Sequence, residues 1–408
     1  MRSRLLSTLL FLMTSVAASA ADAWQQRWSE HLSRDVLPYW QAQSTANTSR
    51  ADDPRTRYFM PQLRLLYVAS VGIARETDSV AQRALRKNFA QRLASLVEQF
   101  QDTATGDWNA LARSVRSPQD AAILSMQDQA WAVYLLADIH ARTGDPAPLQ
   151  LARQTFARID RLAHDEQHAG YYLTYSASGA SMDRQEHGGR KYAAVQLHML
   201  LALARLRSAA PADELLVRRF DEVRPLIPRF VSAESGHARW ALTRDWKEAD
   251  FSPPADNQTL YGQNAEIITY LLDATTSSGG LLDGEKTMLE SIARGLLRDG
   301  ISPDGAVYFR GPMKGAATDR RIWWWPQAET AAALWRLHAL TGNADYLDGF
   351  HRVSAWTFAH TLPPQNSALW RTLTDADGRE LPHGTASHEL QTGFHAIRSL
   401  LLIEKTSP

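Results

Sequence analysis

The stretches IHARTGDPAPL (residues 139–149) and LHALTGNADYL (residues 337–347) decide the fold class, because they are two copies of one connection between helices. Both contain the order His-Ala-x-Thr-Gly followed by Asp or Asn, and both join one apolar, helix-like segment to the next. Glycine adopts the left-handed conformation that commonly ends a helix, so we expect Gly144 and Gly342 directly after the last helical residue. A helical hairpin cannot bury both of its faces alone, and repeated hairpins therefore stack on their neighbours.

Helical periodicity extends over most of the chain. Apolar residues recur three and four positions apart in the segments 58–74, 82–100, 119–142, 147–163, 190–208, 213–232, 262–276, 284–298, 326–341, 344–361 and 388–404. Strand-like alternation is short, as in residues 170–176 and 305–311. We therefore predict an all-α fold in which about a dozen helices, arranged in hairpins, form a closed α/α barrel, with an open helical solenoid as the alternative. Long non-helical segments at 165–189, 234–261, 301–325 and 362–387 follow paired helices and favour a barrel with its loops at one mouth.

The first 20 residues, MRSRLLSTLLFLMTSVAASA, are expected to lie outside this fold. A basic start, an apolar run from Leu5 to Met13 and a final Ala-Ser-Ala are typical of a secretory signal peptide. The run is shorter than the ~20 apolar residues of a membrane span. We expect residues 21–408 to form a single catalytic domain. The chain has no cysteine, so an exported form has no disulfides and fits a bacterial periplasm.

Composition also limits the partners. The chain has 44 basic and 44 acidic residues, without a long run of one sign, which argues against nucleic acid and against a membrane after signal cleavage. No glycine-rich nucleotide loop and no GxSxG motif occur, and the 13 histidines are scattered. We therefore expect no cofactor and no metal. The sequence allows either a monomer or a homodimer.

Several polar residues lie among apolar neighbours near the predicted helix starts. Taken singly, such a histidine is more often a hydrogen-bonded core residue, and such an arginine or glutamate more often forms a pair. In a closed ring, however, the helix starts on one side converge on one cavity, where these residues would form a polar pocket. The set is Arg64, Asp128, His198, Glu266, Glu329, His395 and Arg398.

Three consecutive tryptophans, Trp323 to Trp325, stand just before Glu329. A helix core uses apolar residues three or four positions apart, so at least one of these indoles should face something other than the core. We expect Trp324 and Trp325 to wall the predicted pocket and Trp323 to pack in the core or at the rim.

These elements, taken in order, resemble the N-acylglucosamine 2-epimerase family, which also includes cellobiose 2-epimerases and mannose isomerases. The resemblance extends from about residue 57 to 402. It rests on QLR (62–64), DQAW (128–131), KYAAVQLHMLLA (191–202), YGQNAEI (261–267), WWPQAE (324–329) and GFHAIR (393–398). The WWPQAE element matches the family's Trp-Trp-x-Gln-Ala-Glu at every specified position.

The resemblance implies an (α/α)6 barrel that acts on a carbohydrate substrate without a cofactor. In the family, two histidines face the open-chain sugar and move a proton at C2 through a cis-enediol, a task that suits imidazole. The carry-over makes His395, His198 and Glu266 catalytic, with Gln263 at the place of the other histidine. An arginine matching Arg64 steadies the enediolate oxygen. The sugar-binding set becomes Arg64, Asp128, Lys191, Trp324, Trp325, Glu329 and Arg398.

The departures from the family pattern bear on the reaction. An amide cannot shuttle protons, so Gln263 removes half of the acid/base pair. Further departures are Ala194, Leu201, Leu390 and Gln391. Epimerisation needs protons on both faces of C2, whereas an aldose–ketose isomerisation can use His395 alone on one face. We therefore rank isomerase above 2-epimerase. The alternatives are a glycoside hydrolase or lyase that uses Asp128, Glu266 and Glu329, and a non-catalytic glycan-binding protein.

Overall fold

The computed structural model describes residues 23–45, 53–179, 189–251, 257–276, 278–363, 367–385 and 390–406. The predicted signal peptide lies outside these residues. Within them, no helix combines the length and apolar character that crossing a membrane requires.

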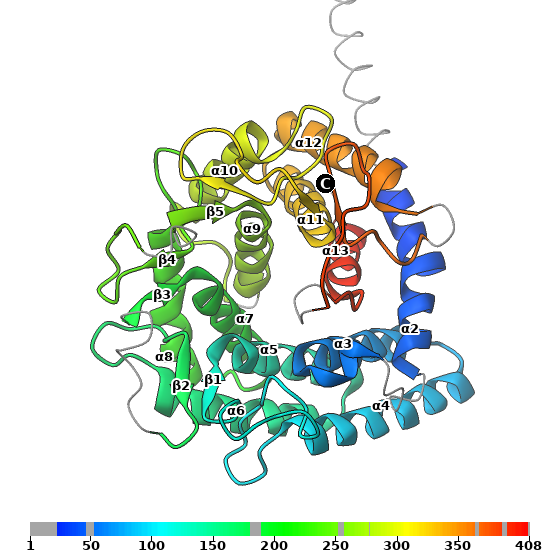
Figure 1. Cartoon of the computed structure of the whole chain (residues 1–408), viewed down its shortest axis with the longest axis vertical. Helices are drawn as coiled ribbons and strands as arrows, with labels where there is room; N and C mark the ends of the chain where they lie inside the picture. Colours follow the sequence, from blue (N-terminus) through cyan, green and yellow to red (C-terminus); the bar gives the residue numbers. More distant parts are fainter. Residues whose placement is uncertain are drawn as a thin grey trace, which may run out of the picture.

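Six helices form an inner ring, and each packs against the next (Figure 1). They are α3 (Phe59–Arg75), α5 (Met126–Thr143), α7 (Ala193–Ala209), α9 (Tyr261–Thr276), α11 (Trp324–Thr341) and α13 (Phe394–Lys405). The ring closes because α13 contacts α3. The predicted (α/α)6 barrel is confirmed, and the open solenoid is wrong.

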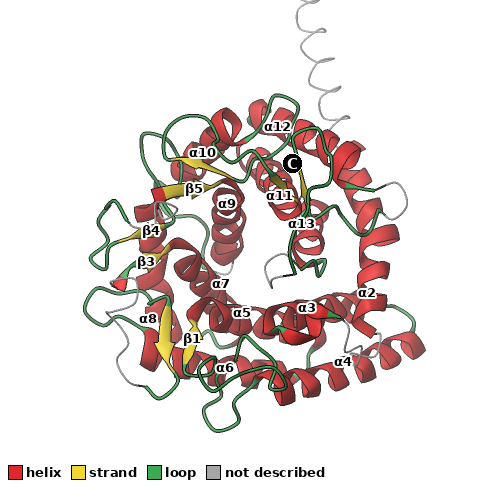
Figure 2. Ribbon diagram, in the orientation of Figure 1, coloured by secondary structure: helices red, strands yellow, loops and turns green. Residues whose placement is uncertain are grey.

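An outer layer of helices surrounds the ring (Figure 2). It contains α2 (Leu37–Thr45), α4 (Ser79–Phe100), α6 (Pro146–Ala163), α8 (Glu214–Val223), α10 (Glu285–Gly295) and α12 (Ala344–Trp356). Short 3-10 or π segments extend three of these helices: η4 (Arg224–Phe230), η6 (Leu296–Gly300) and η7 (Thr357–Thr361). Two more lie near the N-terminus, at η1 (Leu32–Val36) and η2 (Pro54–Arg57).

The sixth helical pair differs from the predicted hairpin, because it joins the two ends of the chain. The indole of Trp28 donates to Ser354 Oγ at 2.9 Å, and Gln25 donates to the carbonyl of Ile403 at 3.1 Å. Arg75 and Glu404 form an ion pair at 2.6 Å between α3 and α13. The helical residues 23–31 and η1 therefore supply the outer partner of α13.

Short strand pairs connect the loops at one mouth of the barrel. β1 (Ile123–Ser125) pairs with β2 (Thr174–Ser176), and β3 (Lys191–Tyr192) pairs with β4 (Ala241–Leu242). β5 (Gln258–Leu260) pairs with β6 (Arg310–Pro312), and β7 (Ile322–Trp323) pairs with β8 (Leu373–Thr374). In each pair, the strand before one inner helix joins a strand in the loop before the next inner helix. The strand pairs therefore link successive loops around the mouth of the barrel.

The structure shows how the repeated connection at residues 139–149 and 337–347 ends one helix and begins the next. Gly144 and Gly342 have φ of 72° and 69°, as predicted for left-handed residues at helix ends. The histidine of each copy folds back onto the next helix start: His140 Nδ1 bonds to the carbonyl of Asp145 and His338 Nδ1 to that of Asn343, at 2.7 and 3.0 Å. The side chains of Asp145 and Asn343 then cap α6 and α12.

Two predicted helix starts are wrong. Residues 119–125 form turns and β1, because Ser125 caps α5 and fixes its start at Met126. The last helix begins at Phe394 rather than at 388, since Gly393 before it is left-handed with φ of 71°.

Candidate active site

Five inner helices carry the same two-residue unit at their starts. The fourth residue of each is Gln or Asn, and the sixth lies at the cavity side of the ring. The pairs are Gln62 and Arg64, Gln129 and Trp131, Gln196 and His198, Asn264 and Glu266, and Gln327 and Glu329. The order Gln/Asn-x-(cavity residue) is visible in the sequence, although this repeat was not among the predictions.

The amide of this unit binds the backbone of the preceding loop. Gln129 accepts from the Trp108 N–H at 3.0 Å and donates to its carbonyl at 2.6 Å. Gln196 does the same to Tyr171 at 2.9 and 2.7 Å, and Gln327 to Val307 at 3.1 and 2.9 Å. Asn264 accepts from Ala238 at 3.0 Å. These amides set the rotation of each helix, so the residue two positions later points to the cavity.

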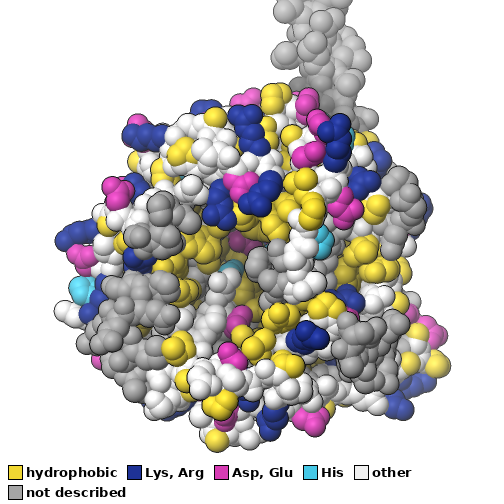
Figure 3. Space-filling model, viewed as in Figure 1, with side chains coloured by type: hydrophobic (Ala, Val, Ile, Leu, Met, Phe, Trp, Pro, Cys, Tyr) yellow, Lys and Arg dark blue, Asp and Glu magenta, His cyan; other side chains and the backbone are white. Residues whose placement is uncertain are grey.

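The mouth opens into a hollow at the centre of the molecule, with acidic and histidine side chains visible in its depth (Figure 3). His395 lies at the start of α13 and is 6% exposed. Its Nδ1 bonds to Glu329 Oε1 at 2.9 Å, while Arg398 donates to Glu329 Oε2 at 3.2 Å. A carboxylate at Nδ1 fixes the proton on that nitrogen and leaves Nε2 as the base.

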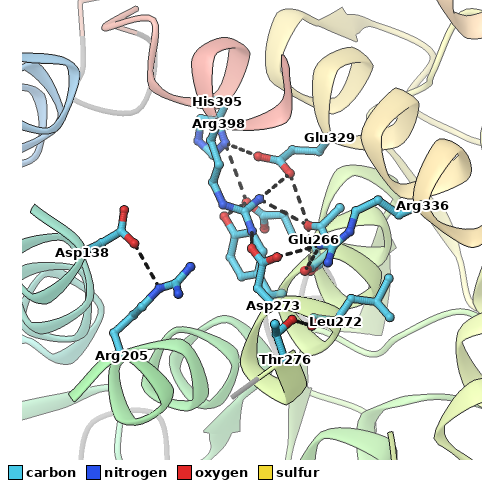
Figure 4. A network of polar contacts seen from close by, with 12 residues as sticks. Asp138, Arg205, Glu266, Leu272, Asp273, Thr276, Glu329, Arg336, His395 and Arg398 are labelled. Atoms are coloured by element: carbon cyan, nitrogen blue, oxygen red, sulfur yellow. Dashed lines mark hydrogen bonds and ion pairs between the residues drawn. The ribbon is translucent and has the colours of Figure 1, made fainter. Parts of the chain in front are cut away.

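An ion-pair chain holds Glu329, the hydrogen-bond partner of this histidine (Figure 4). Arg398 Nη2 bonds to Asp273 at 2.6 Å, and Asp273 also pairs with Arg336 at 2.8 Å. The guanidinium of Arg398 lies 4.1 Å from the ring centroid of Tyr270. Arg398 therefore holds the Glu329 carboxyl group in place, and Glu329 in turn holds His395.

Burial changes the acid–base properties of the pocket. It lowers the pKa of His395 to about 4, against the hydrogen bond to Glu329, and that of His198 to about 3. Burial and the neighbouring Glu329 raise the pKa of Glu266 well above 4.5. Both imidazoles are thus neutral at pH 7, and Glu266 is protonated there.

Arg64, Trp131 and His198 form the opposite side of the site. The ring centroids of Trp131 and His198 lie 4.5 Å apart, and the guanidinium carbon of Arg64 lies 5.1 Å from the Trp131 centroid. Among the described residues, Arg64 Nε, His198 Nδ1 and Gln263 Nε2 are buried without a hydrogen-bond partner. Buried polar atoms are normally satisfied, so this set suits a ligand rich in hydroxyl groups.

The three tryptophans differ in exposure, and Trp324 is more buried than expected for a wall of the pocket. Trp323 and Trp324 are 8% and 4% exposed, whereas Trp325 is only half-buried. The Trp325 ring lies 5.5 Å from His395 and the Trp324 ring 5.7 Å. A Cβ on Gly262 would lie 2.4 Å from the Trp325 ring, so glycine there lets the indole lie against α9. Trp325 is the accessible wall, and Trp324 belongs largely to the core.

Two predicted residues lie at the margin of this arrangement. Asp128 is half-buried, and burial raises its pKa to about 6 against the opposing charge of Arg64. Lys191 is fully buried in another ion cluster, 3.0 Å from Asp165 and 2.9 Å from the carbonyl of Ala169. Arg244 also bonds to Asp165. The charge of Lys191 is therefore already paired with Asp165, and Lys191 stabilises the loops at the mouth of the barrel.

Sequence reasoning missed Trp131, Tyr270 and Asp273. Trp131 occupies the cavity position of the repeated unit, so the repeat was a usable signal. Tyr270 donates to Glu266 at 3.1 Å, and Asp273 anchors Arg398. These two follow Glu266 by four and seven positions on the same face of α9, which is a helical spacing that also describes an ordinary core.

A metal ion has one possible set of ligands among the described residues. Donor atoms of Glu266, Glu329 and His395 lie within 4.8 Å of one another. Two of the three are already bonded to each other, and Arg398 also holds Glu329. A cation would therefore compete with a proton and a guanidinium. His164 and His168 have a four-residue spacing that the sequence analysis overlooked, but His164 lies 2.5 Å from Glu222.

The fold and site define a class: an α/α barrel with a buried imidazole–carboxylate pair in a polar and aromatic pocket. The model of the N-acylglucosamine 2-epimerase (GlcNAc 2-epimerase) family matches residues 43–398, and the chain belongs to this family. It is 21% identical over 351 residues to the cellobiose 2-epimerase of Bacteroides fragilis, covering 82% of this chain and 86% of that protein. The predicted family is confirmed, and the chain is a carbohydrate epimerase or isomerase.

Solved structures show the same fold. The cellobiose 2-epimerase of Bacillus thermoamylovorans B4167 superposes with a TM-score of 0.79 at 18% identity, over 94% of this chain and 100% of that one. A D-mannose isomerase superposes with a TM-score of 0.67 at 14% identity, over 86% and 87% of the two chains.

Proposed function

We propose that this protein is a cofactor-independent sugar isomerase that moves a proton at C2 of an open-chain aldose, with His395 as the base. The observation that supports this most is the bond between His395 Nδ1 and the anchored Glu329 at 2.9 Å. Among the described residues, no hydrogen bond engages Nε2, which is therefore free to take a proton from carbon. Arg64 supplies positive charge for the developing enediolate oxygen.

Isomerisation is favoured over 2-epimerisation because of Gln263. This side chain is 3% exposed, and its amide nitrogen lacks a partner among the described residues. An amide donates a hydrogen bond to a sugar oxygen but cannot return a proton to carbon. His395 can move the proton from C2 to C1 on one face of the enediol. The names of the related proteins support an aldose or a glycan-derived disaccharide as the substrate class.

The hydrolase alternative has weaker support. Inverting glycosidases hold two carboxyl groups roughly 6.5–9.5 Å apart to admit a water molecule. Here the donor atoms of Glu266 and Glu329 lie within 4.8 Å, and both face the same nitrogen of His395. A non-catalytic glycan-binding protein would not need an oriented base.

Hydrogen exchange at sugar C2 tests the proposal. The purified protein in heavy water, given a panel of aldoses and disaccharides, should incorporate deuterium at C2 of one of them and form the ketose. His395→Asn should abolish both signals, because it removes the base while keeping a polar side chain of similar size. Exchange that persists in the His395→Asn variant would reject this base.

We also propose that the protein works in the periplasm after removal of residues 1–20. The basic, apolar and small residues of this segment follow one another in the order of a signal peptide, which supports export. N-terminal sequencing of protein recovered from the periplasmic fraction should begin at or near Ala21. An intact Met1 in the cytoplasmic fraction would contradict this location.

A further inference from the structure

Two carboxyl groups face one nitrogen of His395. Glu329 Oε1 lies 2.9 Å from Nδ1, and Glu266 Oε1 lies 3.9 Å from it. They differ in access, because Glu329 is 0% exposed and Glu266 is 7% exposed. Only Glu266 is therefore placed to reach a bound sugar.

The charged groups around the two carboxyls also differ. Glu329 accepts hydrogen bonds from Arg398 on α13 and from Thr269 on α9, besides His395. Glu266 accepts one from Tyr270 and, in the described part of the chain, has no ion pair with an arginine. The guanidinium groups of Arg64 and Arg398 act on it without contact and lower its pKa less than burial and Glu329 raise it. The ion pair with Arg398 thus belongs to Glu329, and the raised pKa of Glu266 favours its protonated form.

An aldose–ketose isomerisation has a step that His395 does not perform. A hydrogen must move from C2 to C1, and a second must move from O2 to O1. His395 Nε2 serves the carbon atoms. A carboxylic acid suits the oxygens, because one of its oxygens can give a proton while the other takes one. Gln263 cannot do this, since an amide does not titrate.

We propose that Glu266, in its protonated form, carries the hydrogen between O2 and O1 of the sugar, an inference that rests on the isomerase function proposed above. His395 takes the C2 proton, the C2–H electrons form the C1=C2 bond, and the carbonyl electrons move to O1. Glu266 then gives its proton to O1, which yields the neutral enediol. The Glu266 carboxylate takes the proton of O2, the C2=O bond forms, and C1 takes the proton held by His395. Both residues return to their starting forms.

The test separates the carbon step from the oxygen step. In heavy water, deuterium entry at C2 of the aldose reports the carbon step, and ketose formation reports both. Glu266→Gln should lower C2 exchange by less than about tenfold but lower ketose formation by about 100-fold or more, in the range of lost general acid catalysis. The ratio of exchange to conversion should therefore rise at least about tenfold.

Glu329→Gln is the matched control, because it makes the same change in the carboxyl that orients His395. It should lower exchange and conversion together. Glu266→Asp keeps a carboxyl group and should retain a ratio close to that of the unchanged protein, and it serves if Glu266→Gln does not fold. Parallel loss of both signals in Glu266→Gln would overturn the oxygen-transfer role. Absence of C2 exchange in the unchanged protein with every sugar would instead reject the isomerase function itself.

Discussion

At the scale of single residues, one physical cause moves two pKa values in opposite directions. Removal from water disfavours charge, so it lowers the pKa of His395 to about 4 and raises that of Glu266. The result at neutral pH is a neutral imidazole beside a carboxyl group whose protonated form is favoured, while Arg398 forms its ion pair with Glu329. This is a useful starting state for proton transfer at a sugar.

These shifts predict a bell-shaped dependence of kcat/KM on pH. Activity should rise with pH through about 4, as His395 loses the proton that blocks Nε2. It should fall on the alkaline side as Glu266 ionises, at a pH well above the ordinary carboxyl value of 4.5. In Glu266→Gln, the residual activity should keep the acid limb and lose the alkaline limb. An unchanged alkaline limb in that variant would assign it to another group.

The neighbouring tryptophans should respond differently to the same substitution. Trp325→Ala should weaken sugar binding by on the order of 1 kcal/mol, as expected for a stacking wall, with little loss of stability. Trp324→Ala should lower the free energy of unfolding by roughly 3–5 kcal/mol, because that ring is packed in the core. Binding titrations and thermal melts of both variants check this. Similar melting temperatures for the two variants would show that the division is wrong.

At the scale of elements, the amide at the fourth position of an inner helix couples that helix to its loop. Gln196→Ala should lower the free energy of unfolding by roughly 2–4 kcal/mol, because a buried N–H and carbonyl of Tyr171 lose their partners. Gln62→Ala is the control: its half-buried side chain makes a single bond to the carbonyl of Arg55. That variant should lose no more than about 1.5 kcal/mol. Urea unfolding of both proteins measures the difference, and equal losses would argue against the coupling.

At the scale of the whole molecule, the attachment of the last inner helix to α9 and α11 and the orientation of the base depend on the same side chain. Arg398 reaches from the last helix to Asp273 on α9 and Glu329 on α11. Arg398→Met should lower the free energy of unfolding by roughly 3–5 kcal/mol, since it leaves Glu329 without its cation. It should also reduce C2 exchange, because Glu329 no longer holds His395 in place.

Arg336→Met serves as the comparison for this prediction. It leaves Asp273 bonded to Arg398, so its cost should be smaller and C2 exchange should remain. Denaturant unfolding beside the exchange assay compares the variants. Unchanged C2 exchange in Arg398→Met would show that the ion-pair chain acts only on stability.

Sequence patterns predicted the helices, the repeated connection and the side of each inner helix that carries polar residues. These follow from the 3.6-residue period, from glycine at helix ends and from short motifs, all of which act over a few neighbouring residues. The family and the barrel followed from the order of those motifs. His395, Glu329, Glu266 and Arg64 were therefore predictable as one set.

The tertiary structure alone decided how charge and exposure are divided within that set. Lys191 is paired with Asp165, Trp325 is more exposed than Trp324, and the pKa of Glu266 is raised by burial and by Glu329. The same holds for the sixth helical pair, which the two chain ends form together. Each outcome depends on partners that are far apart in the sequence. Lys191 and Asp165 are 26 residues apart, and His395 and Glu329 are 66 residues apart. Local pattern carries no information on such distances, and desolvation acts only once the ring has closed.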